Sequence, residues 1–450
     1  MRRIRALPAA IRGVRTRPFR AAGFLRAAFV LVLAALSCPS LALDPSRAPW
    51  MYVRTLWRDS LPEATVEAVV PAEDGYLWLG TYEGLVRFDG VEFKVFDSRN
   101  VPEIRNARVL CLVGDRAGGF WAGTQRGGLV RMKNGRFEAW GPERGLASDY
   151  VRKLLLDRDG SLWIATDAGV QRLRDGRIET VESGGAFDDR AVEAFAQSPD
   201  GTLWAGGDRL AAFRAGRWER VPLGPEDQKS SVTALLAGRD GGLWVGSSAG
   251  LARLAPGDGR VSKVDGIPLE AWIRTLAEDS DGSLWIGTYG DGLFRLREGR
   301  FAPLGALTDD ARATSFVMAL AEDREKNLWV GTRSGLLRLR DGTFVAWASK
   351  EGLVGDLART VFQDSKGRIW AGTDGGGLHV LEGERFVDLN ERYGIPEKMI
   401  RTIGEDGDGN IWVGTARMGL VRIRDGRGER FGKAEGLPDP RVRTVLGTRD

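Results

Sequence analysis

The sequence predicts an all-β protein, a β-propeller built from four-stranded antiparallel blades. One tryptophan recurs nine times at spacings of 40 to 44 residues, each time in a short apolar run. Glycine-rich turns such as Asp-Gly precede these runs, and no helical pattern longer than a turn or two follows residue 42. A period near 42 residues with strand and turn content is typical of propeller blades. The nine residues are Trp78, Trp121, Trp163, Trp204, Trp244, Trp285, Trp329, Trp370 and Trp412.

The sixth repeat shows the expected plan of a blade. Its strands are predicted at Ile273–Glu278, Leu284–Thr288, Leu293–Arg297 and residues 300–302, with Pro303 ending the last one. The Asp-Gly pair before the second strand supplies the positive φ that a tight turn needs. A proline is tolerated at the fourth strand because the outermost strand of a blade is an edge.

The repeated tryptophans are predicted to be core residues that wedge between blades rather than ligand-stacking residues. A buried tryptophan removes roughly 150–250 Å² from water, worth at most about 4–6 kcal/mol. Two repeats depart from the pattern: the fourth has GGDRL at residues 206–210, and the seventh has Glu325-Lys326-Asn327 in place of Asp-Gly. The long polar connections at residues 182–190 and 222–230 are predicted to be surface loops.

The repeats predict three regions. Residues 1–42 form a signal peptide, residues 43–355 a first propeller of seven blades, and residues 356–450 the start of a second, incomplete propeller with two blades and the first strand of a third. In this plan the first seven blades run from about Thr65 to about Trp347, and residues 50–57 (WMYVRTLW) supply a strand that closes the first ring. The alternative is one open or enlarged array of nine or more blades.

The first 42 residues are typical of an export signal. They hold eight arginines and no acidic residue, an apolar run of ten at residues 27–36, and small residues at the −3 and −1 positions of the predicted cleavage site, Ser40 and Ala42. The run is too short for a mature transmembrane helix, although an uncleaved anchor and lipidation of Cys38 are alternatives. Cleavage after Ala42 leaves one cysteine, Cys111, which is expected to be a buried small hydrophobe.

Charge argues against a nucleic-acid partner. Without the first 42 residues, 57 basic residues face 61 acidic ones, and the formal charge changes from +4 to −4. Acidic turns such as Asp406-Gly407-Asp408-Gly409 lack the spacing and the glutamate of a calcium loop. No phosphate-binding glycine motif leads from a strand into a helix. The sequence therefore predicts no cofactor and no metal site.

The repeat D-x-x-G-x-L-W-[IVA]-G-T-x-x-G-L-x-R resembles the two-component regulator propeller repeat found in the periplasmic sensor region of bacterial hybrid histidine kinases and propeller-linked diguanylate cyclases. The resemblance runs from about residue 50 to the end of the chain, and DGYLWLGT at residues 74–81 followed by GLVRFDG at residues 84–90 resembles the start of such sensors.

The resemblance implies a periplasmic sensor. Members of the family carry two seven-bladed propellers, an Ig-like module, a transmembrane helix and a cytoplasmic output domain. No kinase motif, GGDEF motif or second apolar span occurs here, so the chain is interpreted as a sensor without its output. The expected partners are a small-molecule or oligosaccharide ligand, a signalling output domain and, as the resemblance implies, a second copy in a homodimer. Membrane contact is expected only through a missing C-terminal region.

Ligand contact is predicted on the propeller face where the turns between the second and third strands meet the approach to each first strand. Aromatic rings beside arginine and aspartate suit a carbohydrate, which stacks on one face and offers hydroxyls to polar groups. The alternative is that these are ordinary solvated turn residues. The predicted contacts are Tyr82, Gln125, Arg126, Tyr150, Arg152, Trp272, Arg274, Tyr289, Asp291 and Arg333.

No catalytic residue is predicted, and the chain is not expected to be an enzyme. Its only histidine, His379, lies in the predicted third strand of the eighth blade, where a packed or exposed structural role is favoured. The favoured function is a periplasmic sensory module that binds a small or carbohydrate-like ligand and signals to an output domain. A periplasmic protein-interaction scaffold is the main alternative, and a propeller lyase is a weaker one.

Overall fold

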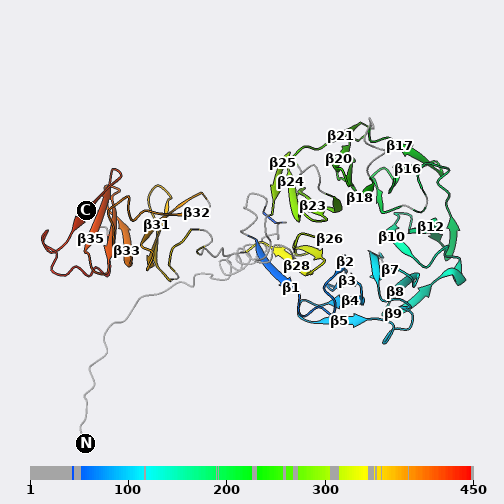
Figure 1. Ribbon diagram of the computed structural model, residues 1–450, viewed down its shortest axis with the longest axis horizontal. Coiled ribbons are helices and arrows are strands. Elements are labelled where there is room, and N and C mark those ends of the chain that lie inside the picture. The colour runs from blue at the N-terminus through cyan, green and yellow to red at the C-terminus, as the bar shows by residue number, and fades with distance from the viewer. Residues whose placement is uncertain are drawn as a thin grey trace, which may run out of the picture. The chain divides into compact units, whose positions relative to one another are not determined.

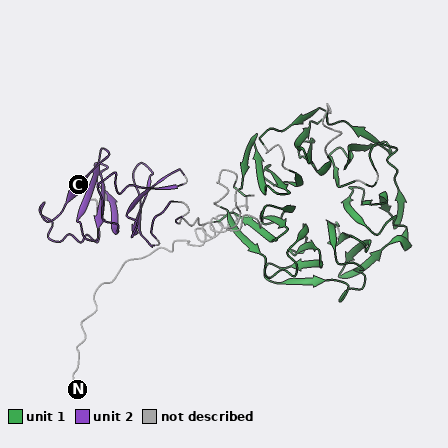
Figure 2. Cartoon of the chain, in the orientation of Figure 1, with its two compact units in different colours: residues 1–342 green, residues 343–450 purple. Residues whose placement is uncertain are grey.

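The computed structural model describes residues 43–44, 52–115, 118–188, 190, 192–224, 231–256, 260–266, 272–304, 314–342, 349, 352–355, 357–383 and 385–446. The predicted signal peptide and Trp347 lie outside these residues. The chain divides into two compact units, residues 1–342 and residues 343–450 (Figure 2); the predicted border lay between residues 355 and 356. Within the described residues, no helix is both long and apolar enough to cross a bilayer.

Unit 1 contains seven four-stranded antiparallel sheets, each a blade (Figure 1). Blade 1 has β2 (Val66–Pro71), β3 (Leu77–Thr81), β4 (Gly84–Phe88) and β5 (Phe93–Phe96), and blade 2 has β6 (Val109–Gly114), β7 (Phe120–Thr124), β8 (Leu129–Lys133) and β9 (Arg136–Trp140). After the 3-10 turn η2 (Pro142–Arg144), blade 3 has β10 (Val151–Leu156), β11 (Leu162–Thr166), β12 (Gly169–Arg174) and β13 (Arg177–Thr180). Blade 4 has β14 (Ala194–Gln197), β15 (Leu203–Gly206), β16 (Leu210–Arg214) and β17 (Arg217–Val221), and blade 5 has β18 (Val232–Ala237), β19 (Leu243–Ser247), β20 (Gly250–Leu254) and β21 (Val261–Lys263). Blade 6 has β22 (Ile273–Glu278), β23 (Leu284–Thr288), β24 (Leu293–Arg297) and β25 (Arg300–Pro303).

Blade 7 joins the two ends of unit 1. Its first three strands are β26 (Val317–Glu322), β27 (Leu328–Thr332) and β28 (Gly335–Arg340), and its fourth is β1 (Val53–Trp57), antiparallel to β28. The prediction that residues near 50–57 close the first ring is therefore confirmed. The first strands of successive blades contact one another around the ring, and β26 contacts β2. These seven first strands lie around the centre of unit 1 (Figure 1) and line one cavity there, which we call the channel.

Unit 2 contains two more blades. Blade 8 has β29 (Leu357–Gln363), β30 (Ile369–Asp374), β31 (Leu378–Glu382) and β32 (Arg385–Asp388), and blade 9 has β33 (Ile400–Glu405), β34 (Ile411–Thr415), β35 (Leu420–Arg424) and β36 (Arg427–Phe431). The strand predicted at the C-terminus is not formed in residues 441–446, which are irregular. Even so, the Val442 amide donates to the Thr415 carbonyl at 3.0 Å.

The glycine that comes two positions after the repeated tryptophan lets neighbouring blades approach each other closely. A Cβ built on Gly287 would lie 2.5 Å from Cγ1 of Val317, the first residue of the next blade's inner strand. The same contact joins Gly80 to Val109 at 2.8 Å, and Gly331 to Val66 at 3.0 Å where the ring closes. Because ordinary carbon contacts are about 3.5–4.0 Å, a side chain at these positions would push the blades apart.

The repeated tryptophan is held by groups of its own blade. Trp285 is fully buried, and its indole N–H donates to Asp279 Oδ2 at 2.8 Å, while the other carboxylate oxygen accepts the Ser283 amide at 2.8 Å. The guanidinium of Arg295, opposite Trp285 on the third strand, lies 5.8 Å from the indole centroid. Seven of the nine repeated tryptophans are buried, as predicted; Trp244 and Trp412 are partly exposed.

Three local details refine the predictions. In blade 7, Lys326 takes the positive φ of 67° that glycine supplies in other turns. The predicted surface loop at residues 182–190 is wrong in part, because Phe187 is 4% exposed and packs edge-on against Trp218 at 5.1 Å. Pro303 pairs with Phe294 and so belongs to the edge strand β25 rather than ending it one residue earlier.

Candidate functional site

An exposed aromatic cluster lies on the predicted ligand face, where blades 6 and 7 meet. We define this aromatic cluster as Trp272, Tyr289, Phe316 and Arg333. The Trp272 and Tyr289 rings are 5.5 Å apart with a 50° angle between their planes, and Phe316 meets Tyr289 edge-on at 4.8 Å. Trp272 and Tyr289 are 47% and 37% exposed.

The backbone and Arg333 fix the aromatic cluster in place. The Tyr289 amide donates to the Trp272 carbonyl at 2.8 Å, and the Arg333 amide donates to the Phe316 carbonyl at 3.2 Å. The Arg333 guanidinium donates to the Tyr289 hydroxyl at 2.9 Å and lies 5.3 Å from the Phe316 centroid. The cluster therefore offers an ordered apolar platform beside a hydrogen-bonding cation.

Four other predicted residues lie at the starts of first strands or contact them. Tyr82 donates its hydroxyl to Glu67 Oε1 at 2.8 Å, and Arg274 reaches the other oxygen of Glu67 at 3.4 Å. Burial and the hydrogen bond to Glu67 raise the pKa of Tyr82. On the other side of the ring, Arg152 pairs with Glu193 at 3.2 Å, and its guanidinium lies 5.0 Å from the Tyr150 ring centroid.

The remaining predicted residues stand apart. Gln125, Arg126 and Asp291 belong to turns between second and third strands, and Arg126 and Asp291 are exposed. The Gln125 amide donates to the Arg108 carbonyl at 2.9 Å, and the Asp291 amide donates to Thr288 Oγ1 at 3.1 Å. Within the described ranges, none of these three side chains forms a hydrogen bond, ion pair or ring contact with another predicted residue. The structure thus divides the ten predicted residues between the aromatic cluster, the channel and isolated turns.

A channel lysine was missed by the sequence analysis. Lys153 lines a cavity of about 220 Å³ formed by the first strands of all seven blades of unit 1. Burial, together with the charge of Arg274, lowers the pKa of Lys153. The charged groups that act on Lys153 come from other blades, so no local sequence motif indicates the site. The usable clue was that Lys153 stands at a strand position where the other repeats have small side chains.

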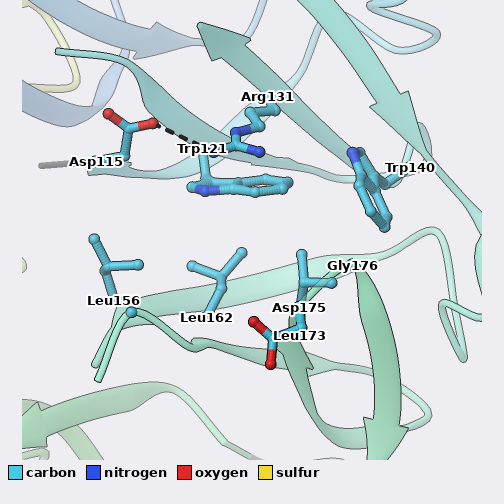
Figure 3. Close-up of a pocket in the computed structure, with 10 residues that line it drawn as sticks. Asp115, Trp121, Arg131, Trp140, Leu156, Leu162, Leu173, Asp175 and Gly176 are labelled. Atoms are coloured by element: carbon cyan, nitrogen blue, oxygen red, sulfur yellow. Dashed lines mark ion pairs between the residues drawn. The ribbon is translucent and has the colours of Figure 1, made fainter. Parts of the chain in front are cut away.

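A second cavity, of about 420 Å³, lies between blades 2 and 3 (Figure 3). It lies toward the strand ends that are opposite to the turns between second and third strands. Trp121 and Trp140 meet edge-on at 5.8 Å on one side, and Leu156, Leu162 and Leu173 face them from blade 3. The Trp140 indole N–H is buried, without a hydrogen-bond partner among the described residues. This inter-blade cavity was also not predicted, because its walls come from two repeats.

The described residues include no group of three or more metal-ligating side chains. His379 is fully buried in β31, and its Nε2 accepts the Val354 amide at 3.3 Å. Burial lowers the pKa of His379. This packed position matches the structural role favoured for this residue from the sequence. Cys111 is likewise buried, as predicted, and burial raises the pKa of its thiol to about 12.

Comparison with protein families gives a specific match. The family model described as "Two component regulator propeller" matches residues 145–168, 267–290, 312–334, 352–375 and 394–417. No curated protein matches the sequence significantly. Five segments of this chain therefore match the two-component regulator propeller repeat, which confirms the resemblance drawn from the sequence.

Solved structures show the same fold. The extracellular domain of a protein assigned as a hybrid two component system from B. thetaiotaomicron aligns with a TM-score of 0.71 and 22% identity, over 83% of this chain and 53% of that one. A second extracellular domain from B. thetaiotaomicron, assigned as a one component system, aligns with a TM-score of 0.56 and 20% identity, over 84% of this chain and 53% of that one. A catalytically inactive virginiamycin B lyase from Staphylococcus aureus aligns with a TM-score of 0.54 and 12% identity, over 64% of this chain and 99% of that one. At these identities the likeness concerns the fold alone, and the chain spans about half the length of the two extracellular domains.

Proposed function

From its two-component regulator propeller repeats, we propose that this chain is the ligand-sensing region of a periplasmic signalling receptor. The propeller itself is a sensor module rather than a catalytic one. The arginine-rich segment at residues 1–42 and the extracellular origin of the similar solved domains support export to the periplasm. The proposed output to which this region signals is a histidine kinase or a diguanylate cyclase.

The aromatic cluster carries the proposal of a carbohydrate-like ligand. Trp272 and Tyr289 leave a large apolar area in water, although they are ordered by backbone hydrogen bonds and by Arg333. A sugar ring has an apolar face that can cover such rings, and its hydroxyls can bond to Arg333 and to the neighbouring Asp291. Because the platform is ordered before binding, little side-chain entropy is lost when a ligand stacks on it.

The test is a screen of soluble oligosaccharides against the full chain by isothermal titration calorimetry. For a saccharide that binds, Trp272→Ala and Tyr289→Ala are each expected to weaken binding about 10-fold or more, since an aromatic contact of about 1.4 kcal/mol corresponds to that factor. Tyr76→Ala is the matched control: Tyr76 also stacks on an arginine, with Arg87 at 4.2 Å, but lies in a turn between first and second strands. Equal losses in Tyr76→Ala and Trp272→Ala, or no binding saccharide at all, would contradict the proposal.

The interaction-scaffold alternative has one observation in its favour, which is an uncovered face on blade 8. Val361 in β29 is 65% exposed and Leu357 is 61% exposed. The matching residue of blade 1, Val69, pairs across its sheet as Val361 does and packs against Trp329 of the preceding blade. The occupant that fits this face is another four-stranded blade, from this protein or from a second copy. Concentration-dependent self-association that Val361→Lys abolishes would favour this alternative.

A further inference from the structure

One lysine breaks a column of small residues in the inner strands. In each blade, one residue of the first strand pairs with the glycine or alanine that comes two positions after the repeated tryptophan. Only blade 3 has a charged side chain at this position. The column reads Ala68, Cys111, Lys153, Ala194, Ala234, Thr275, Ala319, Thr360 and Thr402.

Lys153 is a charged residue of the channel that has no partner among the described residues. The other charged side chains of the neighbouring column are paired, Arg152 with Glu193 at 3.2 Å and Arg274 with Glu67 at 3.4 Å. Lys153 has no hydrogen bond or ion pair among the described residues, and its side chain is only partly exposed. The cavity lining therefore holds two cations, Lys153 and Arg274, and one carboxylate, Glu67, which leaves one positive charge in excess. A partly buried charge without a partner is unfavourable and attracts an anion.

The cavity around Lys153 has the size of a small solute. Its volume of about 220 Å³ is many times the roughly 10–15 Å³ that one water needs. Arg274 and Thr275 line the same cavity from blade 6. The Thr275 hydroxyl has no hydrogen-bond partner among the described residues, while the Thr233 hydroxyl is already used on the Ile273 carbonyl. A cation, a second guanidinium and a free hydroxyl thus converge on one space.

We propose that Lys153 and Arg274 form an anion site in the channel of unit 1 that binds a small monocarboxylate. The ammonium of Lys153 and the guanidinium of Arg274 donate to the two carboxylate oxygens, and Thr275 is a further donor. One excess positive charge matches one carboxylate, whereas a phosphate dianion would leave a negative charge beside Glu67 and Glu193. This site goes beyond the proposed carbohydrate contact, since it shares no residue with the aromatic cluster.

The site predicts a pH dependence. Lys153 faces Arg274, which disfavours its protonation, and Glu193 and Glu67, which favour it; Cys111 stays neutral because its pKa is raised to about 12. The carboxylate binds the protonated amine, and the pKa of Lys153 is already lowered in the free protein. Monocarboxylate affinity is therefore expected to fall as pH rises through the pKa of Lys153, and binding is expected to take up protons in that range.

The experiment titrates sodium acetate into the full chain by isothermal titration calorimetry at constant ionic strength. Lys153→Ala is expected to lower acetate affinity about 10- to 100-fold, as expected for loss of a charge-assisted hydrogen bond. It should fold, because four other repeats have alanine at the same position. Lys153→Arg is expected to retain binding to within a few-fold. The matched control, Lys133→Ala, removes an exposed lysine at the end of β8 and is expected to change nothing.

Several outcomes would overturn the site. Acetate affinity unchanged in Lys153→Ala, or acetate heats that sodium chloride reproduces in the wild type, would remove the role of Lys153. Inorganic phosphate binding more tightly than acetate would overturn the assignment to monocarboxylates. Failure of oligosaccharides to bind leaves this site untouched, because the acetate titration reports the channel alone. Acetate binding that survives Trp272→Ala is expected.

Discussion

Replacing Gly287 by alanine tests whether the ring is held by blade-to-blade contacts at the glycine before Thr288. Gly287 lies in β23 without a positive φ, so alanine causes no backbone strain there. The added methyl would lie 2.5 Å from Val317 Cγ1 and 2.6 Å from Thr275 Cγ2. Ordinary carbon contacts are about 3.5–4.0 Å, so each overlap is about 1 Å.

The magnitude follows from two opposing effects. Overpacking a filled interface costs about 1–3 kcal/mol. Alanine also restricts the unfolded chain relative to glycine, which stabilises the fold by about 0.4–1 kcal/mol. We therefore expect Gly287→Ala to lower the free energy of unfolding by about 1–2 kcal/mol. Gly114→Ala is the matched control: its Cβ would meet nothing closer than 3.5 Å, so it should be neutral or stabilising.

A double-mutant cycle with Val317→Ala separates the interface from local effects. Val317 is fully buried in blade 7, and its truncation makes room for the methyl of Gly287→Ala. Urea unfolding followed by tryptophan fluorescence should give a favourable coupling of about 1 kcal/mol between the two substitutions. A neutral Gly287→Ala, or additive effects of the two substitutions, would refute the view that this glycine exists to admit the neighbouring valine.

Two further predictions concern the aspartate that holds the repeated tryptophan. Asp279→Ala removes the acceptor of buried N–H groups, including the Trp285 indole, and is expected to lower the free energy of unfolding in urea by about 2–4 kcal/mol. The control is Asp200→Ala, at an exposed turn aspartate, which should lower it by less than about 1 kcal/mol. Equal losses in the two variants would contradict the role of the indole bond. For Asp406, burial raises the pKa, but hydrogen bonds led by the Trp412 indole outweigh it and lower the pKa to about 2. Its carboxylate therefore stabilises the fold above about pH 4, and the excess free energy of unfolding of the wild type over Asp406→Asn should shrink between about pH 4 and pH 2. An excess that stays unchanged over this range would contradict the lowered pKa of Asp406.

The fold could be predicted because each blade repeats local chemistry. The strands of blade 6 were predicted almost to the residue, since Asp-Gly turns and apolar alternation mark their ends within the segment itself. The role of residues 50–57 was also predicted, because a ring needs a partner for its last blade. The loop at residues 182–190 was mispredicted as surface, because its polar composition hides Phe187, whose partner Trp218 lies about 30 residues away.

The candidate sites were less accessible from sequence for a related reason. Tyr289 and Arg333 were selected one by one from turns, and only the fold shows that they bond to each other. Lys153 was passed over, since a lone lysine in a strand has no motif. The cavity beside Trp140 needs leucines from the next blade. Sites made by several repeats depend on the packing angle between blades, which local patterns do not encode.

The repeats nevertheless provide an internal comparison that separates structural from functional residues. Positions where nearly all copies agree, such as the glycine of the second strand, have a packing reason in every blade. In blade 3 two departures coincide: Lys153 replaces a small residue, and its cross-strand partner is Ala165, where the other eight blades have a glycine. The blade pattern explains neither change: the lysine adds a charge that has no partner among the described residues, and the alanine adds a methyl group where the other eight blades have glycine. A partly buried charge that lines the channel cavity without a partner among the described residues fits the anion site proposed above, so Lys153 is the first residue to change.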